Sequence, residues 1–272
     1  MTIPELSENQ PDGEKTKPGK ESKDDQETTH FGFHKIPTQE KVRWVRDHFD
    51  TVAQKYDLMN TILSFGIHYL WKHTSVDLLR LQPGDSLLDI CGGTGDLSIL
   101  ALKRTKGLRK VILVDINRKM MEIGRRKSTN ASFRKEIGYV QGDAEGLPFG
   151  PGEFDAAMVG FGFRNLTHME EGFKEMHRVL KPGGRFMCLE FSNPTNPLFR
   201  RLYDFYSFHI MPLLGLLIGG SRQAYTYLPE SIRLFPSPRE LTRLLEEIGF
   251  RQVNYRPLTN GIAVVHWGSK PA

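Results

Sequence analysis

Short apolar runs and longer amphipathic stretches alternate along the middle of the chain. Apolar runs at residues 86–91, 110–115 and 138–143 are each bounded by polar or glycine-containing turns, and two more follow at 154–160 and 185–191. Amphipathic stretches that begin near Asp96, Asn117 and His168 separate most of these runs. This alternation predicts a parallel sheet with helices wound on both faces. Two further strand-like runs at 252–267, joined through Asn260-Gly261, favour a hairpin and hence an antiparallel edge strand.

Residues 39–81 precede the first strand and carry apolar side chains at helical spacing, so we expect two or three helices there. Two later helix starts have the spacing of a capping box, in which a serine or threonine side chain and a glutamate three residues on satisfy free backbone N–H groups. These pairs are Thr167 with Glu170 and Ser237 with Glu240.

The N-terminal residues differ from the rest of the chain in charge. Eight acidic residues and four lysines precede His30, a charge of −4; since the whole chain carries +5, the remainder carries +9. The acidic residues argue against a mitochondrial transit peptide, and we expect residues 1–29 to be a disordered polar tail. Basic residues elsewhere are scattered, which favours a solvated surface or an anionic membrane and makes nucleic acid an unexpected partner.

The two cysteines and the longest apolar stretch indicate where in the cell the protein is expected to lie. Cys91 and Cys188 lie far apart in strand-like runs, so no disulfide is expected and a reducing cytoplasm fits best. The apolar stretch at residues 208–220 is interrupted by Pro212 and Gly215 and is shorter than the roughly 20 residues of a spanning helix. We expect it to contact a membrane surface without crossing it.

Residues 88–96, LDICGGTGD, place a glycine turn between a strand and a helix, which exposes backbone N–H groups to a ligand. Ser98 stands where a dinucleotide fingerprint needs its third glycine, and Asp96 follows Gly95 where a phosphate-binding loop needs lysine. The loop therefore favours a ligand without pyrophosphate.

Carboxylates follow the first three strands of the predicted sheet. Asp89 precedes the glycine turn, Asp115 lies 20 residues after Gly95, and Asp143 ends the third strand. The carboxyl ends of adjacent parallel strands form the crevice where such sheets bind ligands. Asp115 can accept both ribose hydroxyls, Asp143 can accept from an adenine amino group, and Asp89 with Asp96 favours a cation. Each acid alone is also a common turn residue, but together they indicate S-adenosylmethionine.

Several motifs resemble those of the ubiquinone/menaquinone biosynthesis C-methyltransferases, a class I S-adenosylmethionine-dependent family: YDLMN, FGIHYLWK, GGTGDL, VDIN, GDAEGLPF, FGFRN, RVLKPGGRF, LEFS and YDFYSFHIMP. The similarity runs from residue 27 to the end of the chain. It implies an α/β class I methyltransferase core (residues 83–272) with a mostly parallel, Rossmann-like, seven-stranded sheet and an antiparallel edge strand. It also implies a helical lid at 30–82 and an inserted apolar helical segment at about 197–235.

The resemblance implies a set of cofactor-binding residues, and it implies no metal. The family often has asparagine where Asp143 stands and serine where Gly160 stands, and Gly160 offers only its backbone. The implied residues are Asp89, Gly93, Thr94, Gly95, Asp115, Ile116, Asp143, Ala144 and Gly160.

The implied reaction is methylation of a ring carbon in a prenylated quinol, either demethylmenaquinol or 2-polyprenyl-6-methoxy-1,4-benzoquinol. Arg164 and Asn165 are the candidates to bind and acidify the quinol oxygen, His168 to transfer the proton, and Tyr56 to face the methyl group. A structural ion pair for Arg164, a solvent-facing position for His168 and a packing role for Tyr56 are the alternatives. Candidates for the quinol pocket are Tyr203, Tyr206 and His209.

A polyprenyl tail also predicts a partner. We expect the apolar segment from Phe205 to Ile218, with the helical lid, to form an entrance facing the inner surface of the membrane, although a buried cap or a homodimer contact would explain the same residues. Two other functions remain open at this point: methylation of another phenolic or lipid acceptor, and a non-catalytic S-adenosylmethionine-binding scaffold.

Overall fold

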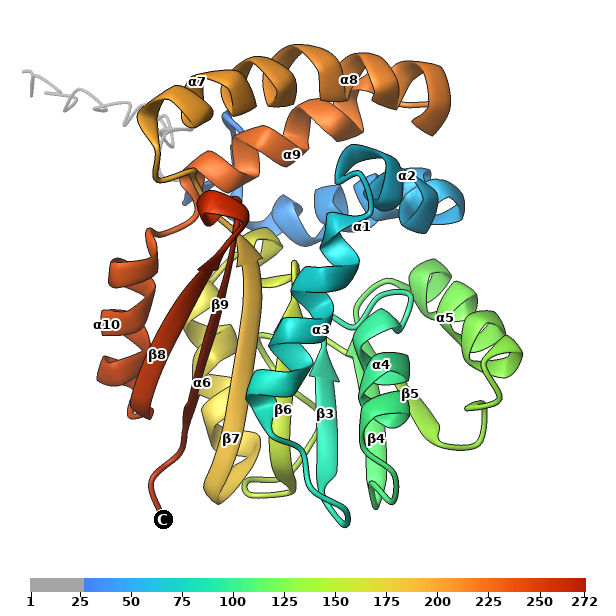
Figure 1. The fold of residues 1–272 in the computed structure, drawn as a ribbon, viewed down its shortest axis with the longest axis vertical. Coiled ribbons are helices and arrows are strands. Elements are labelled where there is room, and N and C mark those ends of the chain that lie inside the picture. Colours follow the sequence, from blue (N-terminus) through green and yellow to red (C-terminus); the bar gives the residue numbers. More distant parts are fainter. Residues whose placement is uncertain (1–26) are drawn as a thin grey trace, which may run out of the picture.

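The computed structural model describes residues 27–272, and its centre is a seven-stranded sheet (Figure 1). The strand order is β5-β4-β3-β6-β7-β9-β8, with parallel pairing from β5 to β7. β9 runs antiparallel to both β7 and β8, so the expected antiparallel pairing at this edge is confirmed. The strands are β3 (Ser86–Ile90), β4 (Lys110–Asp115), β5 (Ile137–Gln141), β6 (Phe154–Gly160), β7 (Leu180–Phe191), β8 (Arg251–Leu258) and β9 (Ala263–Ser269).

Helices cover both faces of the sheet, as the alternating pattern predicted. One face packs against α3 (Ile67–Leu79), α4 (Asp96–Arg104) and α5 (Arg118–Asn130), and the other against α6 (Met169–Val179) and α10 (Pro238–Ile248). Strand β3 is buried along its whole length, because its side chains alternate between these two apolar layers.

A second layer lies above the carboxyl ends of the strands (Figure 1). It consists of the hairpin β1 (Thr28–Phe31) and β2 (His34–Pro37), then α1 (Lys41–Val52) and α2 (Tyr56–Leu63), and the later helices α7 (Pro197–Phe205), α8 (Met211–Leu214) and α9 (Arg222–Leu234). The predicted tail at 1–29 lies outside the described residues except at its end, where Thr28 and Thr29 belong to β1. Phe31 of β1 stacks on Tyr227 of α9 with ring centroids 4.0 Å apart, which ties the two ends of this layer together.

The apolar segment differs from the expectation at one point. Pro212 and Gly215 do not break it: α7, two π-helical turns (Tyr206–Ile210 and Gly215–Gly219) and α8 form one continuous helix from Pro197 to Gly219. A π turn accommodates the missing N–H and the ring of Pro212 without ending the helix. This helix has 23 residues, and its most apolar window of 18 residues has a mean hydropathy of 1.3, enough by length and composition to span a membrane; 33% of that window is buried inside the protein.

The two predicted capping boxes have different outcomes. Ser237 accepts from the backbone N–H of Glu240, whose side chain accepts from the backbone N–H of Ser237, so that box is confirmed. The box at Thr167 is wrong, because α6 begins one residue later, with His168 at the cap position. Glu145 accepts from the backbone N–H groups of both Thr167 and His168 and thereby replaces the expected cap.

Candidate active site

A small cavity of about 80 Å³ lies at the carboxyl ends of β3, β4 and β6, beneath helix α1. We call it the donor cavity. Eight of the predicted site residues line it: Tyr56, Gly93, Asp115, Ile116, Asp143, Ala144, Gly160 and Asn165. The crevice position expected for ligands of a wound sheet therefore contains the residues expected to hold one.

Asp115 is the best-defined acceptor in the donor cavity. One of its carboxylate oxygens accepts from the backbone N–H of Asn117 at 2.7 Å and the other from that of Gly93 at 2.8 Å. Burial raises the pKa of this carboxyl to about 6, although the two N–H groups favour the charged form. Each oxygen keeps lone-pair capacity beyond its N–H partner, an arrangement that fits two adjacent ribose hydroxyls.

Asp143 and the residues around it form the opposite part of the cavity. One Asp143 oxygen accepts from the backbone N–H of Glu145 at 2.9 Å. The apolar side chains of Ile116, Met120 and Ala144 line the space beside it, which fits a flat adenine ring. The sequence analysis did not predict Asn117 or Met120 as site residues; they lie at the start of α5, Asn117 at its cap and Met120 in its first turn.

Three predicted cofactor residues lie beside the cavity without lining it. Asp89 is fully buried below the loop and accepts from the backbone N–H and hydroxyl of Ser98, and burial raises its pKa to about 7. Gly95, with φ of +77°, allows the turn that begins α4. Thr94 points its hydroxyl to Asp57 of α2. Asp89 and Gly95 therefore shape the glycine loop, and Thr94 connects the loop to helix α2, which lies over it.

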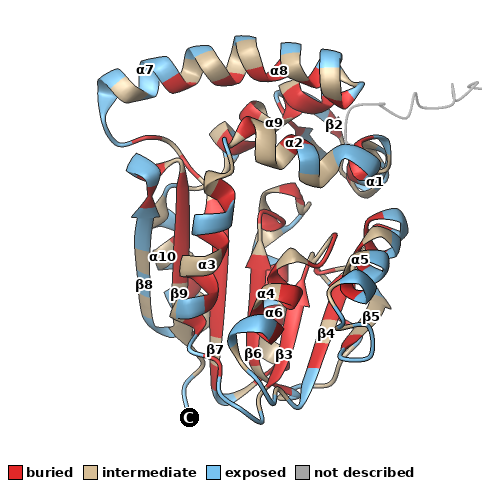
Figure 2. Ribbon diagram, turned by 45° about the vertical axis from the view of Figure 1, so that its right-hand side comes forward, coloured by how far each residue is buried: buried red, intermediate tan, exposed pale blue. Residues whose placement is uncertain are grey.

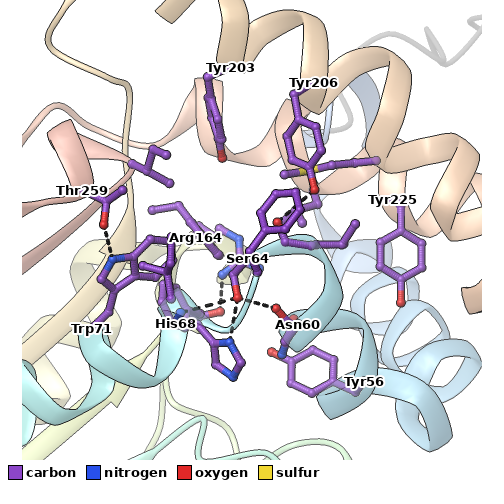
Figure 3. Close-up of a pocket in the computed structure, with 18 of the residues that line it drawn as sticks. Tyr56, Asn60, Ser64, His68, Trp71, Arg164, Tyr203, Tyr206, Tyr225 and Thr259 are labelled. Atoms are coloured by element: carbon purple, nitrogen blue, oxygen red, sulfur yellow. Dashed lines mark hydrogen bonds between the residues drawn. The ribbon is translucent and has the colours of Figure 1, made fainter. Parts of the chain in front are cut away.

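A larger, mostly apolar cavity of about 340 Å³ lies between α1 to α3 and α7 to α9. We call it the acceptor cavity (Figure 3). Phe49, Tyr56 and Phe161 line both cavities, so the two meet at these side chains. Phe65 and Leu202 line it while remaining 78% and 62% exposed, so the cavity opens to the surface between the α2–α3 turn and α7.

Arg164 lies on the wall of the acceptor cavity, on the short 3-10 helix after β6 (Phe163–Asn165), and its side chain is only 5% exposed. Its guanidinium pairs with buried Glu190 of β7 at 3.3 Å and lies 5.4 Å from the ring centre of Phe191. Its Nε is buried and has no hydrogen-bond partner among residues 27–272. A desolvated donor without a partner in an apolar cavity is suited to a ligand oxygen.

The other predicted catalytic residues occupy different positions. Asn165 lines the donor cavity; its amide donates to the carbonyl of Gly162 at 3.1 Å, and its oxygen accepts from Tyr227 at 2.8 Å. Those bonds hold the turn that carries Arg164. His168 lines neither cavity, since its half-exposed ring pairs with Glu145 at 2.9 Å. Sequence alone does not reveal a partner 23 residues away.

Two of the three predicted quinol-pocket residues line the acceptor cavity, and the third does not. Tyr203 and Tyr206 line the acceptor cavity from the long apolar helix, and the hydroxyl of Tyr206 donates to the carbonyl of Leu63 at 3.0 Å. His209 lies outside the cavity lining and stacks on Phe205, with ring centroids 5.0 Å apart.

Figure 3 shows the polar end of the acceptor cavity below Tyr203 and Tyr206. The polar side chains there come from α2, the turn after it and α3, where they recur at every fourth residue: Asn60, Ser64, His68 and Lys72. The sequence analysis assigned none of these residues a role, although the motifs YDLMN and FGIHYLWK contain three of them. The i, i+4 spacing was the signal that could have found them.

The fold and the two joined cavities define a class I methyltransferase. A solved Thermotoga maritima protein, described as an S-adenosylmethionine-dependent methyltransferase and possible histamine N-methyltransferase, has this fold. It matches with a TM-score of 0.58 and 21% identity over 83% of this chain and 99% of that one.

The sequence comparisons are more specific. The ubiE/COQ5 methyltransferase family matches residues 35–270, and the chain belongs to this family. It is 46% identical to a ubiquinone/menaquinone biosynthesis C-methyltransferase of Methylococcus capsulatus, over 89% of this chain and 98% of that one. It is 42% identical to the mitochondrial 2-methoxy-6-polyprenyl-1,4-benzoquinol methylase of Danio rerio, over 89% and 84%. The protein is therefore an S-adenosylmethionine-dependent C-methyltransferase, and the resemblance in its motifs is confirmed.

Proposed function

We propose that this enzyme methylates a ring carbon of a prenylated quinol, either demethylmenaquinol or 2-polyprenyl-6-methoxy-1,4-benzoquinol. The observation that carries the proposal is the meeting of two unlike cavities at Tyr56, Phe49 and Phe161. One presents carboxylates suited to ribose and adenine, and the other is apolar with a polar end. A quinol ring with an isoprenoid tail has the same division between polar head and apolar chain.

S-adenosylmethionine supplies an electrophilic methyl group, so the residues of this chain need to position the ring and increase the electron density on its carbon. Arg164 suits this task, because a desolvated guanidinium on the wall of a mostly apolar cavity stabilises the negative charge that develops on a quinol oxygen. Glu190 fixes the guanidinium from behind, and Asn165 holds the turn below it. Asp115 and Asp143 hold the ribose and the adenine of the donor.

The isoprenoid tail supports contact with a membrane. Exposed residues recur along α7 and α8 of the long helix Pro197–Gly219 (Figure 2), and the large apolar ones among them lie at helical spacing. Exposed Phe65 lies at the mouth of the acceptor cavity. Arg200 and Arg201 lie on the same helix and suit anionic head groups. We place this exposed face of the helix on the cytoplasmic surface of the membrane, and a homodimer stays a prediction. The apolar side chains are Leu198, Leu202, Phe205, Leu213, Leu216 and Leu217.

Methyl transfer from labelled S-adenosylmethionine tests the proposal. The purified enzyme is offered reduced demethylmenaquinone and the demethylated benzoquinol separately, and the mass and methylated atom of each product are determined. A carbon-methylated product identifies the reaction and the pathway. Failure with both quinols, in protein shown by calorimetry to bind S-adenosylmethionine, would reject the proposed acceptor and favour another phenolic or lipid acceptor or a scaffold role.

A further inference from the structure

Two histidines line the acceptor cavity, the buried His68 and the partly buried His48, and His68 has a fixed tautomer. His68 lies in the first turn of α3, close to Ser64, and its Nδ1 is 2.7 Å from the serine Oγ. The same Oγ lies 2.6 Å from the carbonyl oxygen of Asn60, which can only accept. Because a serine hydroxyl has one hydrogen, Ser64 donates to Asn60, and Nδ1 of His68 carries the hydrogen that Ser64 accepts.

This assignment leaves Nε2 of His68 as a lone-pair acceptor. No residue in the described part of the chain is hydrogen-bonded to it, and the ring belongs to the polar end of the cavity (Figure 3). We propose that His68 is the general base of the methyl transfer and accepts the quinol hydroxyl proton at Nε2. This inference rests on the proposed function, because it assigns a residue role for that acceptor.

Other polar groups on the cavity wall are less suited to this role. Lys72 is engaged in an ion pair with Asp96 at 2.5 Å, and Arg164 keeps its proton at any physiological pH. Tyr56 is partly buried, and its desolvation raises the pKa of the hydroxyl and keeps it protonated. His48 is the other histidine on the cavity wall, but its ring packs among aromatic side chains and makes no side-chain hydrogen bond within residues 27–272 that would fix its tautomer.

In the proposed step the O–H bond of the quinol hydroxyl breaks, its proton moves to Nε2 of His68, and its electron pair enters the quinol ring. The nucleophilic ring carbon bonds to the methyl carbon as the methyl–sulfur bond breaks, with that bond's electrons remaining on sulfur. The ring carbon then loses its hydrogen as a proton, His68 returns its own proton to the oxygen, and one proton leaves per turnover.

The acidity of His68 is compatible with this step. Burial, and then the charge of Lys72, lower its pKa to about 4, so the ring is neutral and its lone pair is available at neutral pH. A hydroxyl oxygen becomes far more acidic as its ring attacks an electrophile, and a weak base then suffices. The charged groups acting on the ring from the surrounding helices are Lys72 (α3), Asp96 (α4), Asp57 (α2) and Lys127 (α5).

The test is His68→Asn, whose side-chain amide can still donate to Ser64 but offers no base at the Nε2 position. We expect kcat to fall by about 100-fold or more, with KM for the quinol and Kd for S-adenosylmethionine within about threefold. A more acidic quinol analogue, ionised at the assay pH, should recover most of the lost rate, because it needs no base. His73→Asn, on the same helix outside the cavity, is the matched control and should leave kcat unchanged.

Three results would overturn the inference: kcat within threefold of the parent enzyme, an equal loss with the ionised analogue, or a large loss in His48→Asn with none in His68→Asn. If His68→Asn fails to bind the donor, Ser64→Ala replaces it, since losing the acceptor of Nδ1 should lower kcat about tenfold and shift the acidic limb of the pH profile. A parent enzyme that methylates neither quinol would instead reject the proposed function.

Discussion

The hydroxyl of Thr94 donates a 2.8 Å hydrogen bond to Asp57, and this bond joins the glycine loop to helix α2. Lys127 extends the link, because its ammonium pairs with Asp57 at 2.6 Å and also with Asp96. Asp57 directly follows Tyr56, which lies where the two cavities meet. The cluster therefore fixes helix α2, which covers the site, relative to the glycine loop beside the donor cavity.

We expect Asp57→Ala to weaken S-adenosylmethionine binding by roughly tenfold, since it removes a charge-assisted bond worth about 1–3 kcal/mol from the cover. Calorimetric titration measures the affinity, and stopped-flow displacement should show faster dissociation. Asp47→Asn on α1, away from both cavities, is the control and should change neither quantity. Unchanged donor affinity in Asp57→Ala would mean that the cluster only supports the fold.

Variants of the buried pair of Arg164 and Glu190 can distinguish its contribution to stability from its contribution to catalysis. Arg164→Leu leaves Glu190 unpaired in the core, and we expect a loss of about 3–5 kcal/mol in the free energy of unfolding. Arg164→Leu with Glu190→Leu should restore most of that stability and yet remain at least about 100-fold slower in turnover. Urea unfolding and methyl-transfer assays on both variants check this. Recovery of turnover in the double variant would contradict the role given to Arg164.

Donor binding should depend on pH through Asp115. Its pKa of about 6 means that the carboxylate is charged above this pH and becomes protonated below it. Because ribose hydroxyls donate to the charged form, the affinity for S-adenosylmethionine should fall as pH drops below 6, by up to about tenfold per pH unit. Titrations between pH 5 and 8 measure this. Asp115→Asn should bind more weakly at pH 8 and show a flatter profile, and an equally steep profile would assign the titration elsewhere.

Liposome sedimentation tests whether the exposed face of the long helix contacts a membrane. Leu213→Asp with Leu217→Asp places two charges on the exposed face of the long helix, and we expect sedimentation with anionic liposomes to fall severalfold. Leu234→Asp, an exposed leucine at the end of α9, is the matched control. Leu214 is a poor choice for this purpose, since it packs inward against the cluster around Met59 and Tyr225. Unchanged sedimentation of the folded double variant would show that this face of the helix does not contact the membrane.

The sheet and much of the donor cavity could be predicted from the sequence, because both depend on local signals. Asp115 and Gly93 follow directly from strand ends and a glycine turn, and each lines the cavity as expected. Thr94 shows the limit: its hydroxyl contacts Asp57, 37 residues earlier, and only the packing of α2 on the loop reveals that bond.

The acceptor cavity was harder to predict because five helices from two parts of the chain enclose it. His68 lies inside a motif that the sequence analysis quoted, but its proposed role depends on its tautomer, which the contact with Ser64 in the α2–α3 turn fixes. The continuity of the helix through Pro212 was also missed, since the π turn before the proline accommodates it and no residue pattern used in the sequence analysis indicates such a turn.

The open mouth between Phe65 and Leu202 has a consequence for the range of substrates. A binding site that measures chain length needs a closed end against which the last isoprene unit stops. The acceptor cavity leads outward to the surface at these two side chains, so with the proposed substrate the terminal units of a long tail would lie outside it and would meet no closed end among residues 27–272. The same active site would then serve quinones with any number of isoprene units, and the length found in a cell would be set by the enzyme that built the tail.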